Sequence, residues 1–143
     1  MAESQERVTP SSHRHPLRVY YEDTDFSGVV YHASYLRFLE RGRTEWLRAL
    51  GVDQRALHAA PDAPAFAVRR MSLEFRRPAR MDDELTVETA LAGVRGASVE
   101  LRQAVLRGDE ALVTAEVTVV LVAGGKPRRL PEALKFALGS CCP

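Results

Sequence analysis

The second half of the chain contains four short segments in which apolar and polar residues alternate with a period of two. Arg95-Gly96 and Gly108-Asp109 stand between consecutive segments and favour tight hairpin turns. A period of two is typical of strands in a sheet that has one buried face. The segments are residues 71–76, 85–91, 99–105 and 114–121. The pattern therefore predicts an antiparallel meander whose apolar face needs a covering element.

A helical pattern upstream of the meander, over residues 34–50, predicts that covering element. Its apolar positions fall within one narrow arc at about 3.6 residues per turn. Ser34 is the expected N-cap, and Gly51 stands where a C-cap glycine is expected. Gly42 lies inside the apolar arc and costs about 1 kcal/mol of helix stability relative to alanine. A close approach of the helix to the sheet would explain that cost. The arc comprises Tyr35, Leu39, Gly42, Trp46 and Leu50.

The remaining segments complete a single-domain prediction. A first strand is expected over residues 17–23, a loop over 61–64 and a short terminal helix over 131–138. A strand, one long helix and a meander give a two-layer α+β domain. We expect residues 1–15 to be a disordered leader, residues 16–138 to be the domain and residues 139–143 to be a tail.

Composition excludes several functional classes. The 143 residues carry a net charge of only +1, so no strong field attracts nucleic acid or a membrane surface. No apolar run is long enough to span a membrane, and the polar start lacks the apolar core of a secretory signal. The only cysteines are Cys141 and Cys142, which argues against a disulfide framework and favours a reducing, cytoplasmic setting.

Residues 21–35, with the sequence YEDTDFSGVVYHASY, combine an acidic turn with a helix start. An aspartate there can act as a nucleophile or as a general base. Unpaired N–H groups at a helix N-terminus can stabilise an oxyanion. The structural alternative is that Asp23 and Asp25 cap a turn that Gly28 closes.

This segment resembles the signature of the hotdog-fold acyl-CoA thioesterases of the 4-hydroxybenzoyl-CoA thioesterase type. The motif Asp-x-Asp-x-x-Gly-x-Val followed by Tyr31-His32 is similar to that of the YbgC-like branch, which is associated with the Tol-Pal envelope system. The resemblance is close over residues 19–50 and looser to about residue 122. It implies a hotdog fold, with a five-stranded antiparallel sheet wrapped around one long central helix.

The resemblance also implies roles for individual residues in thioester hydrolysis. Asp25 would be the catalytic carboxylate, as nucleophile or general base, and the backbone N–H of His32 would polarise the thioester carbonyl. The His32 side chain would either contact the thioester region or only satisfy loop carbonyls. Asp23 is expected to be a structural cap. The expected substrate-binding residues are Tyr21, Gly28, Val29, Tyr31 and Arg95.

Alternatives remain at the level of the sequence. Glu40 is a competing catalytic carboxylate on the helix, although an ion pair with Arg43 is its structural explanation. A hotdog enoyl-CoA hydratase is one rival function, but Val30 stands where that motif requires histidine. A non-catalytic acyl-binding or partner-binding module of the cell-envelope machinery is the other rival.

The same resemblance implies the partners. The substrate would be an acyl-CoA or an acyl group presented by an acyl carrier protein, so coenzyme A would be part of the substrate and no separate cofactor is expected. No metal site is expected either. The family pairs subunits, which implies a homodimer or a tetramer. The implied location is the cytoplasm, including the inner face of the bacterial inner membrane.

Overall fold

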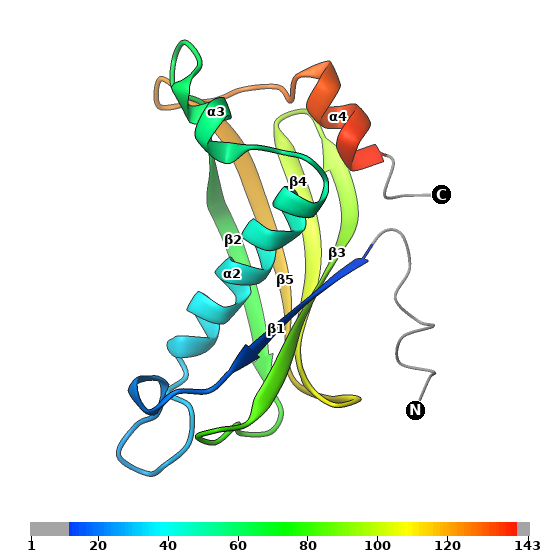
Figure 1. Ribbon diagram of the computed structural model, residues 1–143. Helices are drawn as coiled ribbons and strands as arrows, with labels where there is room; N and C mark the ends of the chain where they lie inside the picture. The colour runs from blue at the N-terminus through cyan, green and yellow to red at the C-terminus, as the bar shows by residue number, and fades with distance from the viewer. Residues whose placement is uncertain (1–11, 140–143) are drawn as a thin grey trace.

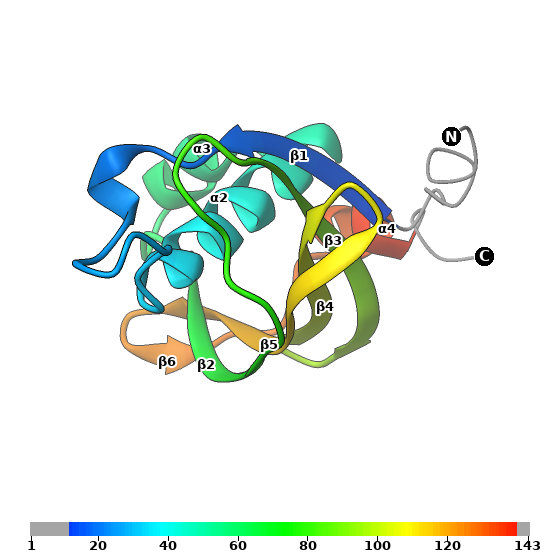
Figure 2. The ribbon, with the colours of Figure 1, turned by 90° about the horizontal axis from the view of Figure 1, so that it is seen from below.

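One antiparallel sheet curls around one long helix, as Figures 1 and 2 show from two directions. The computed structural model describes residues 12–139. The sheet order is β1-β3-β4-β5-β2, so β1 and β2 are its edges, and a two-residue strand, β6, pairs with β5. The strands are β1 (Ser12–Arg18), β2 (Ala65–Phe75), β3 (Glu84–Arg95), β4 (Ser98–Arg107), β5 (Glu110–Ala123) and β6 (Lys126–Pro127).

The long helix, α2 (Ser34–Ala49), lies where the periodicity predicts it. Its N-cap is Ala33 instead of the expected Ser34, and Gly51 ends it with a positive φ of 86°. The buried face includes Phe38 and Leu39, which are completely enclosed between the helix and the sheet. A Cβ atom on Gly42 would collide with the Val87 side chain of β3. The glycine therefore allows the close helix–sheet approach that its position predicts.

The first strand begins earlier than predicted. Residues 17–23 were expected to form it, whereas β1 covers Ser12–Arg18 and Tyr21–Asp23 form a short 3-10 helix, η1. Ser12 pairs with Ala90 and Arg18 with Glu84, so residues 12–15 belong to the sheet and not to a leader. The alternation in this segment is polar, which hid it from a search for apolar periodicity. Residues 1–11 and 140–143, with Cys141 and Cys142, lie outside the described residues.

The other elements extend the prediction. Strand β2 starts six residues before the predicted segment 71–76, and a helix α3 (Gln54–Ala59) precedes it without having been predicted. The two hairpins turn at Gly96 and Gly108, which both have positive φ values. The terminal helix α4 (Glu132–Gly139) buries Leu134 and Leu138. Within residues 12–139, no helix is long and apolar enough to cross a membrane.

Candidate active site

The loop between η1 and α2 holds Asp25 in a turn closed by backbone hydrogen bonds. The Asp25 N–H donates to the carbonyl of Val29 at 2.9 Å, and the Gly28 N–H donates to the carbonyl of Asp25 at 3.1 Å. Gly28 has a φ of 88°, a conformation that residues with a Cβ atom rarely adopt. An isolated bridge between Thr24 and Val30 closes the base of the loop. The glycine predicted to shape this loop therefore does so.

The Asp25 carboxylate is solvent-exposed in the single chain and is held from one side. Its Oδ1 accepts hydrogen bonds from the Ser27 N–H at 2.8 Å and from the Ser27 hydroxyl at 2.7 Å. The hydroxyl bond first, and the N–H bond second, lower the pKa of the Asp25 carboxyl below its ordinary value. The carboxylate is therefore ionised at neutral pH. The Asp25 side chain caps the turn that it begins, as the structural alternative predicted. The carboxylate is also accessible to solvent.

Asp23 connects the loop to the helix. The residue is 4% exposed, and its Oδ2 accepts a hydrogen bond from the Tyr20 N–H at 2.8 Å. Its carbonyl accepts hydrogen bonds from the Tyr31 N–H at 2.9 Å and from the Ser34 hydroxyl at 3.1 Å. These bonds fix the start of α2 against η1. Asp23 is thus a structural residue, as expected.

The start of α2 presents unpaired backbone donors. The N–H groups of Ser34 and Tyr35 bond to the carbonyls of Tyr31 and His32 in the first turn. The N–H groups of His32 and Ala33 donate to no acceptor within residues 12–139. The positive end of the helix dipole adds to these donors. The sequence analysis named the His32 N–H as a candidate donor and did not name the Ala33 N–H, because which N–H groups are left unpaired depends on where the helix begins.

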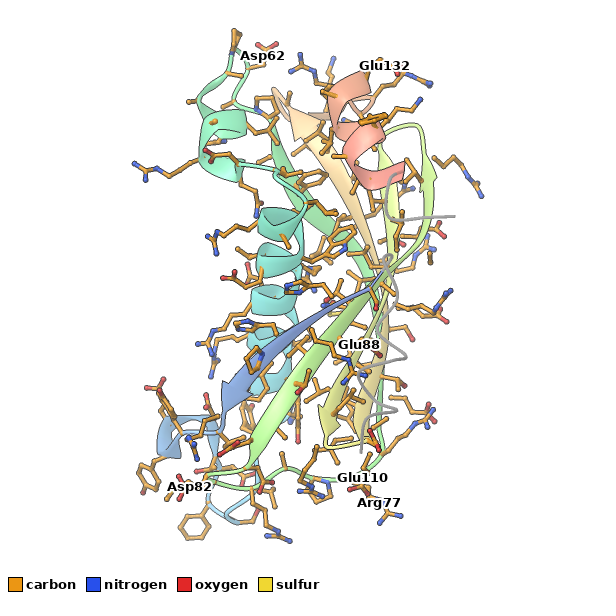
Figure 3. The ribbon with its side chains drawn as sticks, turned by 45° about the vertical axis from the view of Figure 1, so that its right-hand side comes forward. Asp62, Arg77, Asp82, Glu88, Glu110 and Glu132 are labelled. Atoms are coloured by element: carbon orange, nitrogen blue, oxygen red, sulfur yellow. The ribbon has the colours of Figure 1, made fainter. Side chains whose placement is uncertain are left out.

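A hollow of about 290 Å³ adjoins this helix start. The His32 ring stands edge-on to Phe75, with 6.4 Å between the ring centroids, and it also contacts the Tyr31 ring, with 4.5 Å between the centroids. Arg77, on the rim, pairs with Glu110 at 2.9 Å, and Figure 3 shows both side chains at the same end of the sheet. The lining residues are Val30, His32, Tyr35, Phe75, Arg76, Arg77 and Pro78.

Glu40 and Arg43 do not form the ion pair that the sequence favoured. Glu40 is exposed, and no ion pair within residues 12–139 joins it to Arg43. Arg43 instead donates to Gln103 Oε1 at 3.0 Å, and Gln103 Nε2 donates to the Leu39 carbonyl and to Thr89 Oγ1. Burial lowers the pKa of Arg43, and the charge of Glu40 partly offsets this shift. The partner of Arg43 therefore comes from β4 and not from the helix itself.

Comparison with known proteins identifies the family and the fold of the chain. Residues 19–138 match the family model described as the thioesterase-like superfamily. The chain belongs to the thioesterase-like superfamily. Its long helix and curled sheet are the hotdog arrangement, and the predicted fold class is therefore confirmed.

Several similar proteins are named as thioesterases. The chain is 48% identical over 124 residues to the acyl-CoA thioester hydrolase YbgC of Escherichia coli O6:H1, covering 85% of this chain and 91% of that protein. It is 44% identical to the acyl-CoA thioesterase YbgC of Haemophilus influenzae, covering 85% and 90%. The crystal structure of a probable thioesterase from Bartonella henselae superposes with a TM-score of 0.81 at 46% identity, covering 84% and 99%. These matches confirm the predicted YbgC-like resemblance.

The predicted substrate-binding residues do not all lie together in this chain. Gly28, Val29 and Tyr31 belong to the Asp25 loop or its base, and Tyr21 is exposed on the adjoining η1. Arg95 ends β3, whose other end begins beside this loop. At 3.3 Å per residue, the strand separates them by about 36 Å. One chain therefore does not bring Arg95 to the Asp25 loop.

No metal centre is apparent in the described part of the chain. Residues 12–139 contain no group of three or more histidine, cysteine, aspartate or glutamate side chains able to hold a metal ion. The carboxylates near the helix start are instead engaged with hydrogen-bond donors, as Asp23 and Asp25 show.

Proposed function

We propose that this protein hydrolyses acyl-CoA thioesters to a carboxylic acid and coenzyme A, with the Asp25 carboxylate as nucleophile or general base. The observation that carries the assignment of Asp25 is its exposed, ionised state in a hydrogen-bonded turn of the loop that leads into α2. Both donors from Ser27 bind Oδ1, so Oδ2 is the oxygen that attacks the carbonyl or accepts a proton from water. The identity to thioesterases over most of the chain supports the reaction.

The oxyanion formed during hydrolysis needs donors that are already in place. The unpaired N–H of His32 is the proposed donor, with the N–H of Ala33 beside it in the chain. Neither group has an acceptor within residues 12–139, so a substrate oxygen would satisfy a donor that is otherwise left to water. The dipole of the 16-residue helix α2 favours negative charge at this position.

The substrate would approach along the aromatic hollow. Phe75 and Tyr35 supply an apolar floor, and Arg76 and Arg77 stand at the rim, where phosphate groups would be attracted. We expect Tyr21 and Tyr31 to contact the substrate from the side of the Asp25 loop. In this proposal the acyl group is carried by coenzyme A. An acyl carrier protein is the second carrier that could present the same acyl group as a thioester. No cofactor or metal takes part.

A second copy of the chain would complete the site. Strand β2 is an 11-residue edge with no neighbour on its outer side, and Val68 on it is about half exposed. A long, apolar free edge favours pairing with another strand. We propose a homodimer that pairs through β2, alone or as half of a tetramer, with Arg95 reaching a neighbouring subunit's substrate. The proposed location is the cytoplasm, at the inner face of the membrane.

Thiol release from an acyl-CoA panel tests the proposed reaction. Asp25→Asn keeps an oxygen that accepts the Ser27 bonds but removes the charge, so we expect kcat to fall by about 100-fold or more. Asp62→Asn is the matched control, because Asp62 is an exposed loop aspartate at the other end of the molecule from Arg77 (Figure 3). Equal rates in wild type and Asp25→Asn would remove Asp25 from the mechanism. Hydration of crotonyl-CoA without thiol release would identify the hydratase instead.

A further inference from the structure

A second cavity lies between α2 and β2, away from the Asp25 loop. It has a volume of about 90 Å³ and mostly apolar walls, which include Phe66 and Val68 of β2 and Leu138 of α4. Arg43 and Trp46, one turn apart on α2, also line it. Arg43 lies nine residues beyond the first residue of the helix, about 14 Å along its axis at 1.5 Å per residue. The cavity is therefore distinct from the hollow beside the helix start of the same chain.

Two hydrogen-bond donors at this cavity are left unsatisfied. Trp46 is 3% exposed, and its indole N–H has no partner within residues 12–139. Arg43 uses one of its five N–H donors, in the bond to Gln103, and forms no ion pair within the same residues. A buried donor without a partner costs stability, and a half-buried guanidinium costs more when the only opposite charge near it among the described residues, that of the exposed Glu40, forms no direct ion pair with it. Both groups lack the acceptor that a bound ligand would supply.

We propose that this cavity binds a short carboxylate, with the Arg43 guanidinium and the Trp46 indole N–H as its hydrogen-bond donors. A carboxylate matches the planar fork of arginine and provides lone pairs for a further donor. The apolar walls suit a hydrocarbon body, and the volume admits a ligand of roughly six non-hydrogen atoms. Glu40 is also on the lining and disfavours a second negative charge, so the ligand carries one.

The chemistry fits two sources. One is a free short-chain acid, which is also the kind of product that thioester hydrolysis releases. The other is an acyl group that carries a terminal carboxylate and is still attached to its thiol. Binding of the free acid is independent of the proposed hydrolysis, so the two proposals fail separately.

Intrinsic fluorescence provides a direct assay, because Trp46 is the single tryptophan of the chain. Butyrate titrated into the full-length protein is expected to change the emission saturably. Butyramide has the same shape without the charge, and we expect it to bind at least about tenfold more weakly, since hydrogen bonds to charged groups are the stronger ones. Octanoate exceeds the volume and is expected to bind more weakly than butyrate. A folded protein without saturable response to butyrate, or with equal affinity for butyramide, would overturn the proposal.

Variants test the two donors by isothermal titration calorimetry. Trp46→Phe keeps an aromatic ring and removes the N–H, and Arg43→Gln removes the charge, so each is expected to weaken butyrate binding by about tenfold or more. Arg41→Gln is the matched control, because Arg41 is an exposed arginine on the same helix. If Arg43→Gln does not fold, the Trp46→Phe variant still decides. Wild-type affinity in both donor variants would refute the assignment.

The source of the carboxylate is distinguished by competition. Succinyl-CoA, whose acyl group ends in a carboxylate, is titrated into butyrate-loaded Asp25→Asn protein with butyryl-CoA as the uncharged control. Displacement by succinyl-CoA alone supports the acyl group as ligand, whereas displacement by neither thioester supports the free acid. Equal displacement by both thioesters would show that charge does not select the ligand and would contradict the proposal.

Discussion

Replacing Gly42 by alanine is expected to destabilise the fold, even though alanine is the better helix former. The new Cβ atom would collide with Cγ1 of Val87 and would lie 3.2 Å from Thr89 Oγ1. Neither neighbour moves easily. Val87 is completely buried and β-branched, and Thr89 Oγ1 accepts a hydrogen bond from Gln103 at 2.9 Å. The helix or the strand must therefore shift.

The expected size of the effect follows from two opposing contributions. Overpacking a closed core costs up to about 3 kcal/mol. Removing a glycine from a helix interior returns about 1 kcal/mol. The net loss in the free energy of unfolding is about 2 kcal/mol, which corresponds to a decrease in Tm of about 7 °C for a domain of this length.

Urea unfolding followed by Trp46 fluorescence measures the change. Gly93→Ala is the control, because a Cβ atom there meets only the end of Glu100 at 4.0 Å, and we expect a change within about 0.5 kcal/mol. The double variant Gly42→Ala/Val87→Ala removes the obstructing methyl groups. Its loss in the free energy of unfolding should be smaller than the sum of the two single-variant losses by about 2 kcal/mol. A Gly42→Ala protein as stable as wild type, or additive losses in the double variant, would refute the close-approach argument.

Three further changes test the site and its support. Ser27→Ala removes the main cause of the lowered pKa of Asp25, so the acidic limb of the thiol-release pH profile should move to higher pH, and an unmoved limb would contradict the hydrogen bond. Tyr35→Phe leaves the buried Ala79 N–H without its 3.0 Å acceptor and should cost about 1–3 kcal/mol in urea unfolding, with faster amide exchange at Ala79 as the specific readout. Gln103→Leu breaks three hydrogen bonds, two between helix and sheet and one between β3 and β4, and should cost more, about 3 kcal/mol by the same measurement, while a neutral result would show that the network adds nothing to stability.

Strong periodicity explains which elements were predictable. The α2 pattern has one apolar arc and a terminal glycine, and the observed helix matches the prediction to within a residue at its C-terminal end. The strands of the meander alternate cleanly, and their turns carry glycines with positive φ. The true extent of strand β1 was not predicted, because polar residues such as His13 and His15 alternate with equally polar neighbours. Its place in the sheet is decided by backbone pairing with β3, which side-chain polarity does not reveal.

The candidate site likewise has a part that the sequence predicts and a part that it does not. The Asp25 turn is local, since its hydrogen bonds join residues no more than four apart, and sequence motifs capture such contacts. Phe75 and Arg77 reach the helix start from the distant end of β2, and no spacing along the chain indicates that meeting. Arg43 was assigned the neighbouring Glu40 because helical neighbours are the partners that a sequence exposes, whereas Gln103 is its observed partner across the core.

The sequence by itself determined the long helix, the meander and a carboxylate in a glycine turn before the helix, because each depends on residues close together in the chain. Tertiary structure decided how deeply each carboxylate of that turn is buried, because Asp23 is 4% exposed whereas Asp25 faces solvent. It also created the aromatic hollow and the Arg43–Trp46 cavity, because these depend on side chains that only the curled sheet brings to the helix.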